Sequence, residues 1–223
     1  MYLSAPGIRC HPIKTLPSLT PIILEGEHVR LEPLSLTHLH DLCEVGLDET
    51  IWTWYAQPIR SRDDMAAFVR DALDGQARGN MLPFATIDRA GDAAIGSTRF
   101  MNVDLPNRRV EIGSTWIAPP WQRTAINTEA KLLMLRHAFE TLGCNRVELK
   151  TDALNAQSRA AIRRLGAVEE GVLRKHVVTA SGRIRDSVYY SITDDEWPSV
   201  RAGLIARLDA QVIQSRRGSS FPG

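Results

Sequence analysis

The segment that decides the fold runs from residue 108 to residue 171. It begins with R-R-V-E-I-G-S-T-W-I (108–117), A-P-P-W-Q-R-T-A-I-N (118–127) and T-E-A-K-L-L-M-L-R-H-A-F-E-T-L-G (128–143). It continues with R-V-E-L-K-T-D (146–152), A-L-N-A-Q-S-R-A-A-I-R-R-L-G (153–166) and A-V-E-E-G (167–171). Alternating apolar residues in some runs, and apolar spacings of three and four in others, predict the order strand, loop, long helix, strand, short helix, strand.

The long helix of this segment has a wide apolar face, which predicts deep packing. The face is set by residues at spacings of three, four and three: Leu132, Leu135, Phe139 and Leu142. We expect Asn127 or Thr128 to cap the start of the helix, and Gly143 to end it in a left-handed conformation. Because the first N–H groups of such a helix lack partners, its start is a favourable place for an anion.

These elements and their short motifs, in this order, resemble the GCN5-related N-acetyltransferases (GNAT), and among them the ribosomal-protein N-terminal acetyltransferases. The likeness extends from about Leu24 to Trp197, and its main motifs are Glu111-Ile-Gly113, Asn127-Thr-Glu-Ala130, Asn155-x-x-Ser158, Leu165-Gly166 and Glu170-Gly-Val-Leu-Arg174. The resemblance implies a single α/β domain with a mixed, mostly antiparallel sheet of about six to seven strands, splayed at its centre and flanked by helices. It also implies acetyl-CoA as the cofactor and an amine as the acetyl acceptor.

The sequence pattern of the remaining residues indicates one domain with a short extension at each end. The GNAT domain is expected over 21–213, preceded by an N-terminal arm (1–20) and followed by a flexible C-terminal tail (214–223). Further strands are predicted at 27–34, 83–87, 94–100 and 186–192, and further helices at 38–47, after Ser61 and from Trp197 onward.

Composition restricts the class of protein. Hydrophobic residues make up 43% of the 223 residues and charged residues 24%, as in ordinary globular domains. The net charge of +1 argues against broad electrostatic binding of nucleic acid. Cys10, Cys43 and Cys144 have no metal-binding or redox spacing, and no apolar run reaches the length of a membrane span. We therefore expect a cytoplasmic protein without a metal or a membrane partner. Exposed strand edges are compatible with a homodimer.

The resemblance assigns the cofactor to the loop that follows the strand 108–117. The family cradles pyrophosphate with Gln/Arg-x-x-Gly-x-Gly/Ala, whereas this chain has Gln122-Arg-Thr-Ala125-Ile-Asn127 and lacks both glycines. Glycine permits positive φ and close backbone approach, and asparagine tolerates left-handed geometry better than most residues. We expect acetyl-CoA binding to survive. The implied cofactor contacts are Trp116, Ile117, Ala118, Gln122, Arg123, Thr124, Ala125, Ile126, Asn127, Thr128, Asn155, Ser158 and Arg163.

Two residues are the candidates for catalysis. Glu111 matches the strand position where several family members place a general base, and it faces away from Val110 and Ile112. The alternative for Glu111 is a surface residue paired with a neighbouring arginine. Ser158 resembles the serine proposed in this branch to protonate or hold the thiolate, and the alternative for Ser158 is a helix cap. His176, Glu170 and Asp186 are outside candidates.

Three aromatic residues before Pro58 have two open interpretations. By resemblance, Trp52, Trp54 and Tyr55 lie on the acceptor side of the cleft and contact the substrate; alternatively, their rings close the core over a loop. The acceptor itself is a protein or peptide N-terminus, as the branch suggests, or a small amine. A catalytically silent acyl-CoA-binding module of the same fold is the rival function, and it is motivated by the missing glycines.

Overall fold

The computed structural model describes residues 19–218, with side chains through Gln211. Residues 1–18 of the predicted arm and residues 219–223 of the predicted tail lie outside the described residues. The intervening residues 214–218 of the predicted tail form the end of the last helix.

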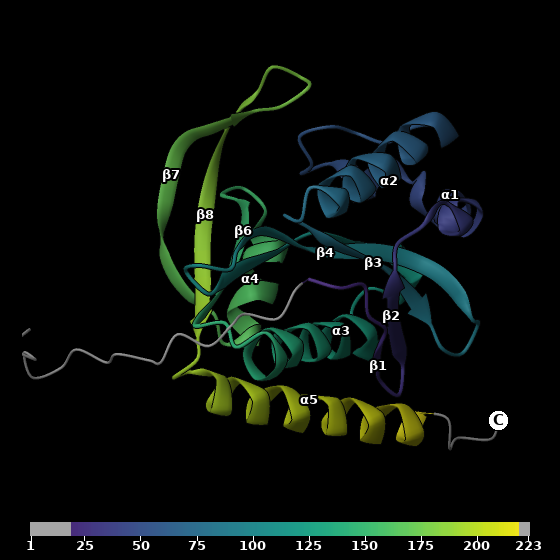
Figure 1. Ribbon diagram of the computed structural model, residues 1–223. Helices are drawn as coiled ribbons and strands as arrows, with labels where there is room; N and C mark the ends of the chain where they lie inside the picture. The colour runs from purple at the N-terminus through teal and green to yellow at the C-terminus, as the bar shows by residue number, and fades with distance from the viewer. Residues whose placement is uncertain (1–18, 219–223) are drawn as a thin grey trace, which may run out of the picture.

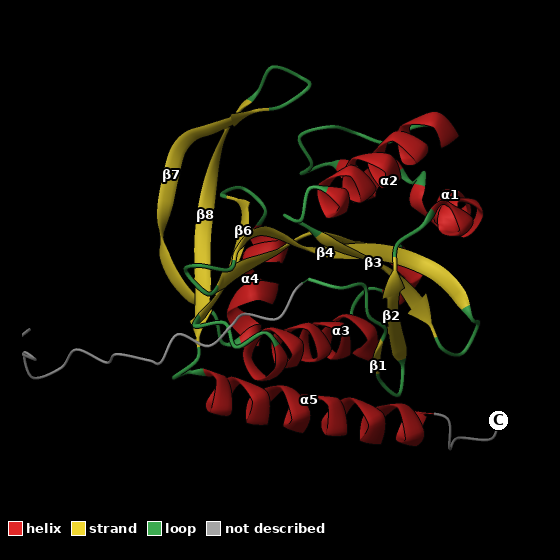
Figure 2. Cartoon of the chain, viewed as in Figure 1, coloured by secondary structure: helices red, strands yellow, loops and turns green. Residues whose placement is uncertain are grey.

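Eight strands form one sheet (Figures 1 and 2), in the order β1-β2-β3-β4-β5-β6-β8-β7. Neighbouring strands are antiparallel except β5 and β6, which are parallel. The mixed, mostly antiparallel sheet is confirmed, but the count of six to seven was wrong, because β1 is too short to show any alternation in sequence. The strands are β1 (Leu24–Glu25), β2 (Val29–Pro33), β3 (Leu82–Asp88), β4 (Ala93–Asp104), β5 (Arg109–Ile117), β6 (Arg146–Asp152), β7 (Val168–Val178) and β8 (Ile184–Thr193).

Helices cover both faces of the sheet (Figure 1), with α1 and α2 on one side and α3, α4 and α5 on the other. Within the described part of the chain, none of these helices has the length and apolar character to span a bilayer. The α-helices are α1 (Leu39–Gly46), α2 (Arg62–Ala77), α3 (Ala125–Arg136), α4 (Ala156–Leu165) and α5 (Trp197–Gly218). Short turns are η1 (Leu36–His38), η2 (Glu49–Trp52), η3 (Pro119–Trp121) and the π-helical turn η4 (His137–Thr141), which extends α3.

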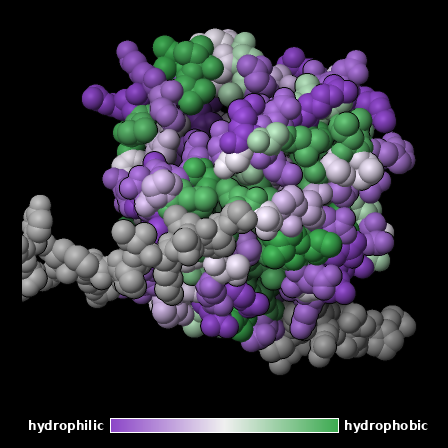
Figure 3. All heavy atoms as spheres, viewed as in Figure 1, coloured by the Kyte–Doolittle hydropathy of each residue, from purple (hydrophilic) through white to green (hydrophobic). Residues whose placement is uncertain are grey.

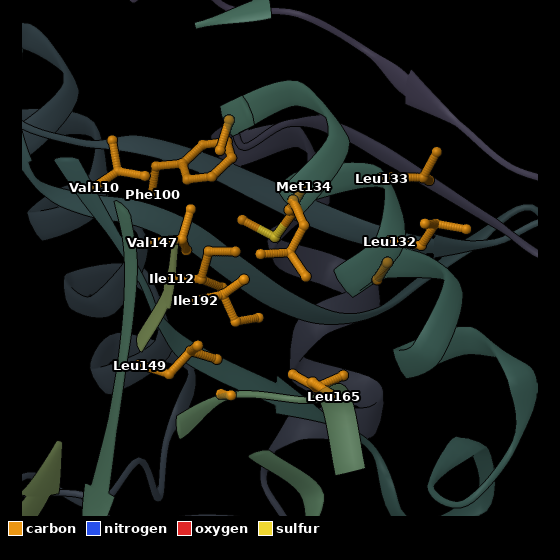
Figure 4. Close-up of a cluster of buried hydrophobic side chains, with 14 of the residues drawn as sticks. Phe100, Val110, Ile112, Leu132, Leu133, Met134, Val147, Leu149, Leu165 and Ile192 are labelled. Atoms are coloured by element: carbon orange, nitrogen blue, oxygen red, sulfur yellow. The ribbon is translucent and has the colours of Figure 1, made fainter. Parts of the chain in front are cut away.

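The larger hydrophobic core lies between the sheet and α3 to α5, and a smaller one lies under α1 and α2. The predicted apolar face of α3 is confirmed, since Leu132, Leu135 and Leu142 are buried and Phe139 packs at the margin. Figure 4 shows how α3 contributes side chains that converge on those of β4, β5, β6 and β8. Its labelled residues are Phe100, Val110, Ile112, Leu132, Leu133, Met134, Val147, Leu149, Leu165 and Ile192.

Helix α3 begins one turn earlier than the sequence predicts. Thr124 has an extended backbone, and its hydroxyl accepts a hydrogen bond from the N–H of Ile126 at 3.4 Å, so Thr124 is the N-cap. The predicted caps Asn127 and Thr128 therefore lie inside the first turn. The other end agrees with the prediction, because Gly143 has a φ of +64°.

A buried carboxylate fixes the N-terminal hairpin to the start of α3. Glu129 accepts hydrogen bonds from the backbone N–H groups of Glu27, His28 and Val29, at 2.7, 2.7 and 2.8 Å. A Cβ atom at Gly26 would come within 2.3 Å of this carboxylate, so the turn between β1 and β2 requires a glycine. This contact holds the first strands of the sheet beside the helix that starts at the predicted cofactor loop.

Replacing Glu129 with alanine should lower the free energy of unfolding by about 3 kcal/mol, because N–H groups at the turn lose a charged acceptor and one of them is buried. Urea unfolding followed by tryptophan fluorescence measures this difference. Glu44→Ala, which changes an exposed glutamate on α1, is the matched control and should change stability by less than about 0.5 kcal/mol. Equal stability of the two variants would contradict the role given to Glu129.

Candidate active site

The two parallel strands at the centre of the sheet separate shortly after they meet. Pairing between β5 and β6 covers only the positions from Arg109 to Glu111, the last pair being Glu111 with Glu148. From Ile112 to Ile117, β5 has no strand partner on the β6 side among the described residues; we call this stretch the free edge of β5. The splayed central strands that the resemblance implies are therefore present.

A β-bulge accompanies the separation. On β4, Thr98 lies between two paired residues, while β5 places both Ser114 and Thr115 in the corresponding interval. Ser114 has a φ of +45°, a left-handed conformation that serine adopts only under constraint. Bulges bend a strand and increase its twist. This one lies where β5 turns away from β6.

Glu111 lies at the last paired position, on the face opposite the large core. Its carboxylate is 2% exposed, and it accepts hydrogen bonds from Asn102 Nδ2 at 2.8 Å and from Lys150 Nζ at 3.1 Å. Its neighbours Val110 and Ile112 face the core, as predicted. Glu111 is thus neither an exposed strand residue nor paired with Arg108 or Arg109, and its partners come from β4 and β6.

The β7–β8 hairpin closes an arch over this face of the sheet. The N–H of Ala180 donates to the carbonyl oxygen of Ala56 at 2.8 Å, which joins the hairpin tip to the loop before α2. Arg183 donates a hydrogen bond to buried Asp152 at the end of β6. Burial acts to raise the pKa of Asp152, but hydrogen bonding by Arg183 leaves it below its ordinary value. Figure 3 shows a hollow, with hydrophilic residues around it, between the protruding end of this hairpin and the helical side.

The three predicted acceptor-side aromatics have different environments. Trp52 is buried, donates a hydrogen bond to the carbonyl of Gly46 and packs against Trp116, which favours the interpretation that its ring closes the core. Trp54 is half-buried, with the guanidinium of Arg183 5.9 Å from its ring centre. Tyr55 packs edge-on against Trp52, and burial raises the pKa of its hydroxyl. Trp54 therefore lies at the arch, next to Arg183.

The predicted cofactor loop keeps an accessible helix start without its glycines. Ala125 and Asn127 are helical residues, so neither position requires positive φ. The left-handed residue of the loop is Arg123, with a φ of +63°. A hollow of about 620 Å³ opens against this first turn, lined by Glu27, His28, Asp88, Arg89, Ala90, Thr124, Ala125 and Ile126. Asn127 also has a buried side-chain oxygen with no partner. The start of the helix fits a phosphate-bearing group because its first N–H groups are donors, whereas the carboxylates of Glu27 and Asp88 and the acceptor oxygen of Asn127 do not contribute to that fit.

Some predicted cofactor contacts are occupied by the protein itself. The N–H of Ala118 donates to the carbonyl of Ile95, and its carbonyl accepts from the N–H of Trp121. The carbonyl of Ile117 accepts from the side chain of Gln122 at 2.9 Å. Ala118 is thus not free to pair with pantetheine, because the chain turns into η3 at this point. The free backbone groups lie earlier, at the bulge, and Trp116 points its ring into the smaller core.

The start of α4 lies where the motif predicts it. Asn155 is the N-cap, and its side-chain oxygen accepts from the N–H of Ser158 at 2.9 Å. The hydroxyl of Ser158 is half-buried and forms no hydrogen bond with a described residue, so capping falls to Asn155 alone. Arg163 is on the exposed side of α4 and pairs with Glu169 at 2.6 Å. It therefore already has a partner.

The three further candidates for catalysis interact with residues at the β7–β8 end of the sheet. Glu170 is held by Arg146 and Ser191, and the hydrogen bond from Arg146 lowers its pKa to about 2. His176 pairs with the hydroxyl of Ser187, and Asp186 accepts from the backbone of β7. Within the described residues, no group of three or more His, Cys, Asp or Glu is placed to hold a metal ion.

Comparison with known proteins agrees with this geometry. The acetyltransferase (GNAT) domain family matches residues 28–168, more than half of the chain. The chain belongs to this family. The prediction of a GNAT fold, and of an N-acyltransferase as the enzyme class, is confirmed.

Individual relatives support the same assignment. The Bacillus subtilis (strain 168) protein YdaF, named as a ribosomal N-acetyltransferase, is 38% identical over 102 residues, 46% of this chain and 55% of that protein. The match thus spans about half the length of that relative, and its name agrees with the predicted branch. A GCN5-related N-acetyltransferase structure from Brucella melitensis has a TM-score of 0.80 and 33% identity, covering 86% of this chain and 88% of its own. An acetyltransferase structure from T. thermophilus has a TM-score of 0.77 and 35% identity, covering 85% and 98%.

The GNAT domain contains a buried lysine that the sequence reasoning missed. Lys131 of α3 is 5% exposed, and its ammonium contacts the hydroxyls of Thr115 at 2.8 Å and Thr98 at 3.4 Å. Burial lowers its pKa from 10.5 to about 7, and no carboxylate of the described part of the chain contributes to this pKa. A signal was available, because Lys131 stands three and four residues before Met134 and Leu135, inside the apolar face of α3.

Asn102 and Lys150, the partners of Glu111, were also missed. Each is an ordinary polar residue on an alternating strand, and only the registers of β4 and β6 bring both to one carboxylate. The sequence contains no sign of this, because Asn102 and Lys150 are separated from Glu111 by turns and a whole helix.

The two lysines of this site should affect stability in opposite directions. Lys131→Met removes an unpaired buried charge and should raise the free energy of unfolding at pH 7 by at least about 1 kcal/mol. Lys150→Met removes the partner of a buried carboxylate and should lower it by about 2 kcal/mol.

The gain from Lys131→Met should also depend on pH. The pKa of Lys131 is about 7 when folded, and a free lysine titrates near 10.4. Between these two pH values the unfolded wild type binds more protons than the folded wild type, so the free energy of unfolding of the wild type rises with pH. The stability advantage of Lys131→Met over the wild type therefore shrinks. Urea unfolding at about pH 7 and about pH 9.5 measures the change. A gain that stays constant over this range would show that Lys131 keeps an ordinary pKa.

Proposed function

We propose that this chain is an acetyl-CoA-dependent N-acetyltransferase that transfers the acetyl group directly to a primary amine in a ternary complex. The single observation that carries the proposal is the buried carboxylate of Glu111 at the last β5–β6 pair, held by Asn102 and Lys150. A carboxylate fixed at the point where two strands part is suited to removing a proton from an incoming ammonium group.

The residues around the start of α3 are proposed to hold the cofactor. The unpaired N–H groups of the first turn favour phosphate oxygens, and Arg123 in the exposed loop adds positive charge. The free edge of β5 offers backbone groups to an extended ligand, as a strand edge does to a peptide. When bound, acetyl-CoA supplies an activated thioester. The protein's part is to hold it against the amine and to manage protons.

The acceptor is proposed to reach Glu111 under the arch formed by the β7–β8 hairpin. Trp54 and Arg183 flank the entrance, and Lys150 and Tyr189 line the same face of the sheet. The name of the Bacillus subtilis relative favours a protein N-terminus as the acceptor, and a small primary amine is the other substrate of this class. We retain the cytoplasm as the compartment and a homodimer as the assembly in this proposal.

The rival function is a silent acyl-CoA-binding module. It was motivated by the missing glycines, yet Ala125 and Asn127 occupy ordinary helical positions. Neither position therefore needs the conformational freedom of glycine, which favours an active site over a vestigial one.

Calorimetric titration with acetyl-CoA tests the cofactor part of the proposal. We expect a dissociation constant in the micromolar range, about −8 kcal/mol. Bound protein should then release CoA thiol in the presence of peptides with free N-termini or of small amines. Binding without thiol release for any acceptor class would support the silent module, and absence of binding would overturn both functions.

Glu111→Gln tests the proposed base. It should lower kcat by about 10²- to 10⁴-fold and change acetyl-CoA affinity by less than about twofold, because Glu111 lies on the face away from α3. Glu148→Gln is the matched control: it changes the paired residue on β6, which interacts with Arg146 and Arg109, and should leave kcat within about twofold. Unchanged turnover in Glu111→Gln would remove Glu111 as the base.

A further inference from the structure

Lys131 carries a buried ammonium that has no opposite charge beside it among residues 19–218. Its two polar contacts are threonine hydroxyls, Thr98 on β4 and Thr115 on β5. Burying an ammonium without a carboxylate is costly, and proteins retain such groups mainly where chemistry uses them. Methionine or leucine would fill the same space on α3 without this cost. Packing therefore does not explain a lysine here.

Resting on the proposed function, we propose that Thr115 and Lys131 form a proton-donating pair for the CoA thiolate that leaves in acetyl transfer. Thr115 would contact the sulfur. Lys131 acts through Thr115 and is a positioning residue, which orients the hydroxyl and replaces its proton.

The position of Thr115 supports this role. It lies in the β-bulge, one residue after left-handed Ser114, where β5 has already left β6. It is half-buried, whereas Lys131 beneath it is buried. Thr115 is thus the more exposed residue of the pair, although its hydroxyl also shares a hydrogen bond of 2.7 Å with that of buried Thr98. The free edge of β5, on which Thr115 lies, is where the cofactor is proposed to lie.

The two proton-handling groups would lie on opposite faces of the sheet. Val110 and Ile112 direct Glu111 to the face away from α3, while Lys131 belongs to α3 itself. A thioester held at the fork between β5 and β6 then has a base on the side of the incoming amine. The donor lies on the side of the departing sulfur. Direct transfer is compatible with this separation, because the base acts on the attacking nitrogen and the donor acts on the departing sulfur.

The step balances as follows. The incoming ammonium first loses one proton to Glu111, which passes it to solvent. The neutral amine nitrogen then forms a bond to the acetyl carbon while the carbon–sulfur bond breaks and its electron pair goes to sulfur, and the second proton released by the nitrogen goes to Glu111. Thr115 gives its hydroxyl proton to that thiolate and takes one from Lys131. Lys131 is left neutral and regains a proton from solvent, so neither an oxidant nor a further reactant is needed.

The surroundings of Lys131 favour this exchange. Its pKa of about 7 results from burial alone, with no charged side chain contributing. On its own helix, Glu129 is turned to the β1–β2 turn, and His137 lies two turns later beside Phe100, with its pKa lowered by burial. From β4 and β5 only threonine hydroxyls face the amine. A thiolate above Thr115 would therefore have Lys131 as its nearest positive charge on this face.

The thiol of bound CoA gives a test that needs no acceptor. The ultraviolet absorbance of the CoA complex, with the desulfo-CoA complex as baseline, is measured from about pH 6 to about pH 10 in wild type, Lys131→Met and Thr115→Val. A free thiol titrates at about 8.5. We expect the thiolate to appear at least about one pH unit lower in wild type than in either variant, and Lys131→Arg to retain the wild-type value.

Turnover supplies the second measurement, with an amine that the wild type accepts. Lys131→Met and Thr115→Val should each lower kcat by about 10-fold or more, with KM for acetyl-CoA within about twofold, and the double variant should be no worse than either. Ser97→Ala, which removes a buried hydroxyl on β4 that donates to the carbonyl of Phe84, is the control and should keep the wild-type kcat. Thr115→Val keeps the shape of a half-buried side chain, so it remains informative if Lys131→Met fails to fold.

The outcomes separate this proposal from the function on which it rests. If wild type binds neither CoA nor acetyl-CoA, the acetyltransferase proposal fails and this one fails with it. If wild type binds and turns over, but the thiol titrates at the same pH in all proteins and kcat is unchanged, the Thr115–Lys131 pair alone is overturned. The same holds if Ser158→Ala, rather than either variant, shifts the thiol titration.

Discussion

The parallel pairing of β5 with β6 stops at Glu111, and the organisation of the site depends on that stop. A parallel pair at the centre of a sheet normally continues, because each lost residue gives up ladder hydrogen bonds. Here the bulge at Ser114 and Thr115 turns β5 outward, and η3 then leads the chain away from the sheet toward α3. One local distortion thus sets the position of Glu111, the free edge of β5 and the start of the helix. The large core around Phe100 and Met134 makes the distortion tolerable, since it keeps the two strands anchored while they diverge.

Buried charges mark which parts of the fold are structural and which are held ready for chemistry. Glu129 is fully engaged by three backbone N–H groups and Asp152 by Arg183, and both hold segments together. The partners of Glu111 hold its carboxylate in place at the point where β5 and β6 separate. Among the described residues, the ammonium of Lys131 has two threonine hydroxyls as its hydrogen-bond partners. Because burial is expensive for any charge, the degree of compensation is itself informative.

Much of the fold could be predicted from the sequence, since apolar periodicity determines which residues face the core. The face of α3, the start of α4 near Asn155 and the left-handed Gly143 follow from local rules, and the family resemblance follows from the order of motifs, whereas the cap of α4 was considered at Ser158 and is Asn155. Three features could not be predicted, because they depend on how distant segments meet. Thr124 caps α3 only because η3 delivers it with an extended backbone, Trp52 is buried only because Trp116 lies under it, and Lys131 reaches Thr115 only because of the bulge. The position of the candidate site was proposed from the sequence, but the residues that set its electrostatics, Asn102, Lys150 and Lys131, were not.

The β7–β8 hairpin has a geometric consequence for anything that approaches Glu111. Its tip meets Ala56 through one backbone hydrogen bond and Asp152 through Arg183, so an open trough becomes a ring. In the proposed function, the acceptor reaches Glu111 beneath this closed hairpin. A chain end or a small amine suits such an approach better than a folded surface does.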